Sequence, residues 1–253
     1  EISLGLVGSE MCIRDSLIPA TLEGRATHNV SNAMFAAAMA FALGLRLEAI
    51  RQGLRTFDTT FFQSPGRLNL FEEHPFKVLM DYAHNAHAAA TMTDLARRMD
   101  VDGRRIVVLS APGDRRDTDI DAVARAVAGQ FDHYILRRDD ARRGRGEDEV
   151  PQRLARALRA AGVDAEAIEL IRDEQQAVDA ALRMGRPGDL VLIFADQLSR
   201  TWKQITKFRA EGSAAPSPVQ RTTHAQDDEE TPNALPEGVV QDARGLVFRR
   251  ETD

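Results

Sequence analysis

The chain has 253 residues, of which 43% are hydrophobic and 28% are charged, and its formal net charge is −6. That length is enough for one large domain or two small ones with a substantial core. The negative charge gives no reason to expect nucleic acid or an anionic membrane as a partner. No apolar run approaches the roughly 20 residues of a membrane span. The single cysteine, Cys12, excludes an internal disulfide, so the cytoplasm is the expected location.

Residues 1–16 show no sustained helical or strand period. They resemble translated adapter sequence at the broken end of a reading frame, so we expect a non-native leader and a longer natural protein. Residues 17–63 form the next segment, in which apolar residues recur at helical spacing from 28 to 57. Gly44 is suited to end the first of two predicted helices.

Residues 64–208 are predicted to be an α/β domain. A turn at Gly66 and Arg67 precedes a pair of strands, 68–72 and 76–82. Helices and strands then alternate, which predicts a Rossmann-like, mostly parallel sheet with helices on both faces. The helices are expected at 87–99, 118–129, 149–161, 174–184 and 198–207, and the strands at 105–110, 133–136, 167–171 and 190–195.

Residues 209–253 are rich in Pro, Ser, Thr and acidic residues and lack an apolar period. Such a composition cannot bury enough surface to offset the entropy of ordering, which predicts a disordered acidic tail. Within it, residues 245–250 could dock as one short strand.

Polar residues follow the predicted strand 76–82, at the edge where α/β sheets place active groups. Asp81 can accept both hydroxyls of a ribose, while His84 and Asn85 can bind substrate or phosphate oxygens. An alternative is that Asp81 and Asn85 only cap the next helix.

Other polar groups lie at corresponding places. Arg67 follows a glycine in a turn and can bind a phosphate through both arms of its guanidinium. Residues 113–117 connect a buried strand to a helix and suit an anionic ligand, although internal ion pairs are the alternative. The loop 142–147 follows the next strand at the same edge of the sheet and could also bind a ligand. The alternative is that its charges only face solvent. No Gly-x-x-x-x-Gly-Lys-[Ser/Thr] occurs, so the chain has no P-loop.

These patches, in this order, resemble the Mur ligase family, and finer features resemble its cyanophycin synthetase branch. The similar segments are IPATLEGRATHNVSNA (18–33), GRLNLF (66–71), DYAHNA (81–86), APGDRRDTDI (111–120), RRDDARRGRGE (137–147) and ADQLSRTW (195–202). The resemblance runs from about residue 18 to 208. It identifies residues 17–63 with the end of a central ATP-binding domain and residues 64–208 with the C-terminal domain.

The resemblance implies ATP-dependent formation of an amide bond through an acyl phosphate. In the cyanophycin branch, arginine is joined to the aspartate side chains of a poly-aspartate backbone. ATP and Mg²⁺ are implied as cofactors, with Mg²⁺ bound mainly outside this chain, and no metal ligands are assigned here. A homo-oligomer is implied for the full-length protein. The chain by itself is expected to be inactive, because the P-loop is absent.

The resemblance also assigns roles to residues. It implies that His28, Asn29 and Asn32 line the adenine pocket, where helix capping is the alternative. Arg67 would contact ATP phosphates and Asp81 the ribose, and Arg67 and His84 would be catalytic. The residues that would face the incoming amino acid are His84, Asn85, Asp114, Arg115, Arg116, Asp117, Arg143 and Arg145.

The chain departs from the family pattern at Ala86, where the family usually has proline. Two other functions remain open. One is a different Mur-type ligase, acting on folylpolyglutamate or on a peptidoglycan precursor. The other is a non-catalytic module that binds a nucleotide or an amino acid.

Overall fold

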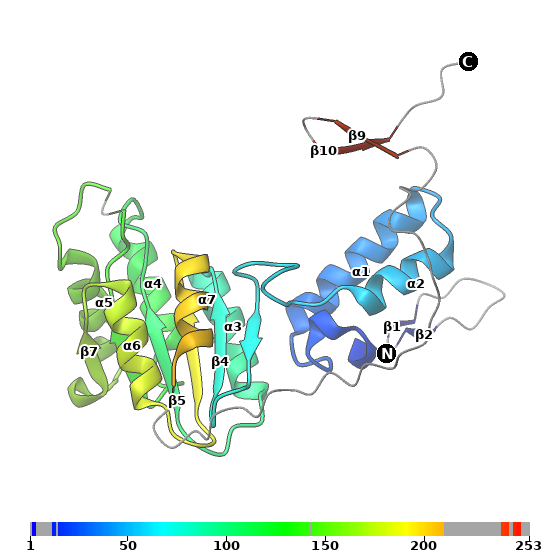
Figure 1. Cartoon of the computed structure of the whole chain (residues 1–253). Coiled ribbons are helices and arrows are strands. Elements are labelled where there is room, and N and C mark those ends of the chain that lie inside the picture. The colour runs from blue at the N-terminus through cyan, green and yellow to red at the C-terminus, as the bar shows by residue number, and fades with distance from the viewer. Residues whose placement is uncertain are drawn as a thin grey trace. The chain divides into compact units, whose positions relative to one another are not determined.

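The computed structural model describes residues 2–3, 12–13, 15–141, 143–209, 239–242 and 245–248 (Figure 1). The described residues up to Arg209 belong to one compact unit, and the later ones to a second. The first unit contains a pair of helices and a six-stranded sheet. This agrees with the predicted α/β class.

The central sheet has the strand order β3-β4-β8-β5-β6-β7. β3 pairs antiparallel with β4, and every other pairing in the sheet is parallel. All four inner strands are almost wholly buried, as strands covered on both faces are. The strands are β3 (Asn69–Phe71), β4 (Lys77–Asp81), β5 (Arg105–Leu109), β6 (His133–Leu136), β7 (Ile168–Leu170) and β8 (Leu190–Phe194).

Helices cover both faces of the sheet. α3 (Ala86–Arg98), α4 (Asp117–Val127) and α5 (Glu149–Ala160) pack on one face, against alternate strand residues such as Leu79 and Leu192. α6 (Glu174–Met184) and α7 (Leu198–Lys207) pack on the other face, against Met80 and Ile193. β6 and β7 lie progressively outward from β5, whereas α6 returns the chain inward to β8. Right-handed crossovers therefore require α6 to lie on the opposite face.

The helical pair consists of α1 (Thr27–Ala42) and α2 (Leu47–Thr56), preceded by the short 3-10 turns η1 (Asp15–Leu17) and η2 (Pro19–Thr21). Alanine, the strongest helix former, supplies much of α1. Gly44 has a φ of +81° just after α1, which confirms its role at the helix end. Only Ala33 and Ala37 of α1 are buried.

Most predicted elements were located within one or two residues, and the exceptions are short. Residues 1–16 contain β1 (Ile2–Ser3) and β2 (Cys12–Ile13), which pair antiparallel. The predicted strand near residue 245 exists as β10 (Gly245–Phe248), but its partner is β9 (Val239–Asp242). The structure thus has two strands in this segment, β10 where a strand was expected and β9 where it was not. Residues 210–238, which carry most of the predicted acidic tail, lie outside the described residues.

Candidate functional site

The carboxyl ends of β4, β8, β5 and β6 lie next to one another at one edge of the sheet. β4 and β5 are followed by α3 and α4, which lie on one face of the sheet. β8 lies between these two strands and is followed by α7, which lies on the other face. Loops diverge at such a switch point and leave a crevice, which is where α/β proteins bind ligands. Asp81 is the last residue of β4, and residues 110–117, Arg137 and Asp196 follow the ends of β5, β6 and β8.

The turn before β3 is fixed from inside the protein by Asn69. Its Oδ1 accepts the Gly66 N–H at 2.7 Å, and its Nδ2 donates to the carbonyls of Thr59 and Ser64 at 2.8 and 2.9 Å. Asn69 is fully buried. The role of this side chain was not predicted, although it lies within the GRLNLF motif.

Asp81 holds the same turn from the neighbouring strand. Its Oδ2 accepts the Leu68 N–H at 2.9 Å, and the side chain is buried. Burial raises the pKa of Asp81, against the opposing effects of the Leu68 N–H and the Arg67 charge. One carboxylate oxygen is thus already engaged by the protein backbone, so the structure assigns Asp81 a structural bond beside its predicted contact with ribose.

Arg67 is exposed at the tip of this turn. Its guanidinium makes no hydrogen bond or salt bridge within the described residues. Backbone bonds from both sides hold its neighbours, since Tyr82 N–H donates to Gly66 O at 2.9 Å. Arg67 is therefore a free cation on a rigid support.

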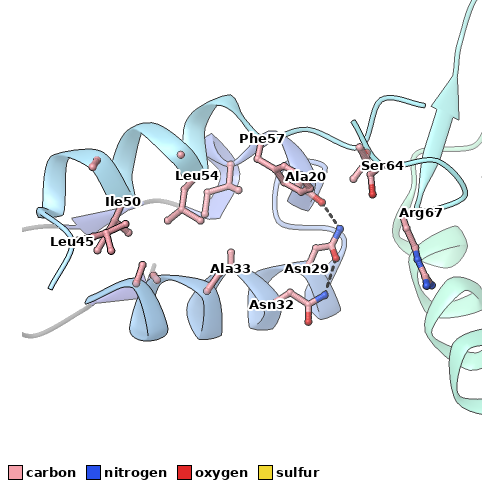
Figure 2. Close-up of a pocket in the computed structure, with 17 residues that line it drawn as sticks. Ala20, Asn29, Asn32, Ala33, Leu45, Ile50, Leu54, Phe57, Ser64 and Arg67 are labelled. Carbon is pink, nitrogen blue, oxygen red and sulfur yellow. Dashed lines mark hydrogen bonds between the residues drawn. The ribbon is translucent and has the colours of Figure 1, made fainter. Parts of the chain in front are cut away.

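An apolar cavity of about 580 Å³ lies between α1 and α2. Its walls are small and branched side chains, including Ala33, Ile50 and Leu54. Figure 2 shows Leu45 and Ile50 at one end, and Asn29 and Asn32 toward the end that Ser64 and Arg67 approach. The cavity thus combines an apolar interior with amides and a cation near one end.

The two asparagines are linked to each other. Asn29 Nδ2 donates to Ala20 O at 2.7 Å, and Asn32 Nδ2 donates to Asn29 Oδ1 at 3.1 Å (Figure 2). Asn32 Oδ1 accepts no hydrogen bond within the described residues. His28 does not line the cavity; burial lowers its pKa, and the charge of Asp94 on α3 opposes that shift. Of the predicted adenine trio, Asn29 and Asn32 line the cavity and His28 does not.

A second cavity, of about 270 Å³, lies between the start of α3 and α4. Its polar lining includes His84, Asn85, His87 and Arg115. Asn85 also caps α3, because its Oδ1 accepts the Ala88 N–H at 2.9 Å, as the alternative interpretation expected. His84 Nδ1 lies 3.0 Å from Tyr82 O, which fixes the ring beside the cavity.

Most of the predicted substrate residues after β5 and β6 form ion pairs within these loops and the start of α4. Asp114 accepts from Arg143 at 2.7 Å, and the Arg143 guanidinium lowers the pKa of Asp114. Arg116 pairs with Asp119 and occupies the N-cap position of α4. Arg142 lies outside the described residues.

A buried charge network lies on the other side of the edge, and sequence reasoning did not predict it. Arg137 is fully buried and donates to Asp196 Oδ2 at 2.9 Å and to Phe194 O at 2.7 Å. Glu174, also buried, lies 3.1 Å from Arg137 and accepts the Asp196 and Gln197 N–H groups. Arg137 stood in an arginine-rich motif, and only its place directly after an apolar strand distinguished it.

The described residues contain no group of three or more His, Cys, Asp or Glu side chains that could hold a metal ion. Three acidic groups near the edge, Asp114, Glu174 and Asp196, pair with arginines. Burial, and next the charge of Asp196, raise the pKa of Asp139.

Within the described part of the chain, no helix is both long enough and apolar enough to cross a bilayer.

Comparison with known proteins matches residues 66–196 to the model of the Mur ligase glutamate ligase domain. The chain is 35% identical over 191 residues to the cyanophycin synthetase of Geminocystis herdmanii, covering 76% of this chain and 22% of that protein. It is 37% identical to the cyanophycin synthetase of Synechocystis sp. over 190 residues, covering 75% and 21%. The chain therefore spans about a fifth of the length of these curated relatives.

Solved structures agree in fold. Escherichia coli FolC in complex with ADP matches with a TM-score of 0.55 at 25% identity, over 69% of this chain and 39% of that one. The UDP-N-acetylmuramate–alanine ligase of Thermotoga maritima matches with a TM-score of 0.53 at 15% identity, over 71% and 37%. Since the family model covers residues 66–196 and includes the whole edge from Gly66 to Asp196, this chain belongs to the Mur ligase family.

Proposed function

We propose that the chain is part of an ATP-dependent amide-bond-forming ligase of the cyanophycin synthetase type. The observation that carries the proposal is the arrangement of the sheet edge. Two loops at this edge each carry an arginine without a salt bridge among the described residues. Arg67 lines the cavity between α1 and α2, and Arg115 lines the cavity between α3 and α4. The similarity to cyanophycin synthetases over three quarters of the chain supports this choice among Mur-type ligases.

The cavity between α1 and α2 is the proposed adenine site. A purine has two apolar faces and a polar edge, and an asparagine amide can bind that edge with one donor and one acceptor. Asn32 has a free Oδ1 for an exocyclic amine, and Asn29 orients Asn32. Arg67, at the cavity margin, would then neutralise phosphate charge.

The cavity between α3 and α4 is the proposed site of the incoming amino acid. Arg115 would bind its carboxylate, and His84 and Asn85 would orient the amine. The amine nitrogen attacks the carbonyl carbon of an aspartyl phosphate; an amide C–N bond forms, and the C–O bond to phosphate breaks. The amine loses its proton and inorganic phosphate departs. Catalysis of this kind relies mainly on positioning and charge neutralisation.

The remaining expectations belong to the same proposal. Mg²⁺ would accompany ATP and be held mainly by the part of the central ATP-binding domain that this chain does not contain. Arginine and a poly-aspartate chain are the proposed substrates, the cytoplasm is the proposed location, and the complete protein is proposed to be a homo-oligomer.

The test is ATP turnover by the protein expressed from its complete reading frame, with a poly-aspartate primer. Arginine is compared with lysine, ornithine and glutamate as the added amino acid. We expect phosphate release to be at least tenfold faster with arginine than with the others. Equal rates with all four would overturn the cyanophycin-type assignment, and rates highest with glutamate would favour a different Mur-type ligase.

A further inference from the structure

Arg145, in the loop after β6, binds the loop after β5 with all three guanidinium nitrogens engaged. Its Nε donates to Gly113 O at 2.7 Å, and its Nη2 donates to Arg115 O at 2.7 Å. Nη2 also lies 2.9 Å from Asp117 Oδ1, and Nη1 donates to Glu149 Oε1 at 2.6 Å. Carboxylates on both sides raise the pKa of Arg145, with Asp117 contributing first.

This arrangement leaves Arg145 little capacity for a ligand. The side chain is 18% exposed, and its donors already face two carbonyls and two carboxylates. Glu149, in the first turn of α5, also accepts the Gly146 N–H at 3.1 Å, so it holds Arg145 from behind. Arg145 therefore links the start of α5 rigidly to the turn 113–117.

The turn held in this way carries Arg115 to the cavity it shares with His84 and Asn85. The backbone of Arg115 is fixed at both ends, because its N–H donates to Pro112 O at 3.2 Å and its carbonyl accepts from Arg145. Its guanidinium has no hydrogen bond or salt bridge within the described residues. A free side chain on a fixed backbone is the arrangement that a preorganised anion site needs.

We propose that Arg145 is a positioning residue that aims Arg115 at the carboxylate of the incoming amino acid, and that it does not touch the substrate itself. The inference rests on the proposed function of the cavity between α3 and α4. A lysine at position 145 could keep the charge, but its single ammonium cannot span two carbonyls and two carboxylates as the planar guanidinium does.

Arg153 on α5 provides a matched control. It binds the same Asp117 at 2.6 Å and also Asp121 at 2.8 Å. Its Nε also donates to the Asp117 carbonyl at 3.1 Å, but unlike Arg145 it makes no contact with the carbonyls of Gly113 and Arg115 within the described residues. Removing Arg153 costs comparable ion pairs on α4 but leaves the support of Arg115 in place.

The experiment compares Arg145→Ala, Arg145→Lys and Arg153→Ala in the protein expressed from its complete reading frame. Steady-state ATP turnover gives KM for arginine and for ATP separately, and thermal unfolding gives the loss of stability. For both Arg145 variants we expect KM for arginine to rise at least tenfold, with KM for ATP changed less than twofold. For Arg153→Ala we expect both KM values to stay within twofold at a similar fall in Tm.

Three results would overturn the proposal. KM for arginine could rise equally in Arg145→Ala and Arg153→Ala, which would indicate a general loss of structure. Arg145→Lys could retain the wild-type KM, which would show that charge alone suffices. KM for ATP could rise as much as KM for arginine. If the unmodified protein shows no turnover that depends on an amino acid, the proposed function itself fails, which is a distinguishable outcome.

For variants that lose activity altogether, hydrogen exchange of the 253-residue chain gives a second readout. Peptides covering residues 111–120 should exchange at least threefold faster in Arg145→Ala than in Arg153→Ala. Equal exchange in the two variants would contradict the proposed support of the turn.

Discussion

The guanidinium of Arg137 lies 3.1 Å from the carboxylate of Glu174, and neither side chain reaches solvent. The pair joins the end of β6 to the start of α6, and Asp196 joins it from the end of β8. The carboxylate of Glu174 also accepts the first free N–H groups before α7 and the Thr201 hydroxyl. One buried pair thus fixes three segments at the carboxyl edge of the sheet.

We predict that Arg137→Ala lowers the free energy of unfolding by about 3–5 kcal/mol, because it leaves the buried Glu174 carboxylate without a cation to balance its charge. Urea denaturation measures this change. Arg98→Ala is the control, since its pair with Asp94 is 48% and 44% exposed and such pairs contribute only about 0.3–0.5 kcal/mol. Equal losses in the two variants would show that the buried pair does not hold the edge together.

Asn69→Ala should lower the free energy of unfolding by about 2–3 kcal/mol, because the carbonyls of Thr59 and Ser64 and the Gly66 N–H lose their buried partner. Chemical denaturation measures the loss. Asn32→Ala, at an exposed position, should change stability by less than about 0.5 kcal/mol. A loss for Asn69→Ala no larger than that of the control would contradict this role.

Gly66→Ala should be destabilising for two separable reasons. Gly66 has a φ of +70°, and an added Cβ would lie 2.5 Å from Leu198 Cδ1. Gly44 has a φ of +81° with no atom within 4 Å, so Gly44→Ala isolates the backbone strain of about 1–2 kcal/mol. We expect Gly66→Ala to cost more than Gly44→Ala.

A double-mutant cycle separates the clash from the strain. Leu198→Ala should cost less in the Gly66→Ala background than in the wild-type chain, because it removes the atoms that the new Cβ meets. Additive effects in the cycle would show that the turn moves aside, and that Leu198 does not limit the residue at position 66.

Asp81 should make stability depend on pH. Its pKa is raised above the usual 3.8, chiefly by burial, so the folded state holds the proton more tightly than the unfolded state. This contribution is present at pH values below 3.8 and is lost as pH rises through the raised pKa. Asp81→Asn keeps an oxygen to accept the Leu68 N–H but does not titrate.

Denaturation midpoints of wild type and Asp81→Asn should therefore be measured from about pH 4 to pH 7. We expect Asp81→Asn to gain stability relative to wild type as pH rises. A constant difference across the range, or one that shrinks, would show that burial does not disfavour the charged form of Asp81.

The sequence predicted the alternation of strands and helices because the apolar periods of 2.0 and 3.6 residues are local properties. It also located the polar edge: Asp81, Asn85 and residues 113–117 follow buried strands, and parallel strands bring such ends together. Strand β9, the partner of β10, was missed, because a few residues of strand composition within a polar segment give little signal.

Side-chain partners were much less predictable. Arg143 and Arg145 were both expected to face a substrate, yet they bind Asp114 and the backbone of the turn 113–117. Arg115 and Arg116 are adjacent in the sequence and look alike there. Arg116 pairs with Asp119, whereas Arg115 has no salt bridge among the described residues of that turn. Nothing in the local spacing distinguishes a paired arginine from a free one.

The sequence by itself determined the α/β class, the order of the elements and the group of loops that meet at one edge, because each depends on local periodicity and on the handedness of crossovers. Only the tertiary structure decided which charges at that edge are engaged with one another. Arg137 reaches Glu174 across 37 residues of chain and Arg145 reaches Gly113 across 32. Such pairs depend on where distant segments are brought into contact, which composition and spacing do not encode.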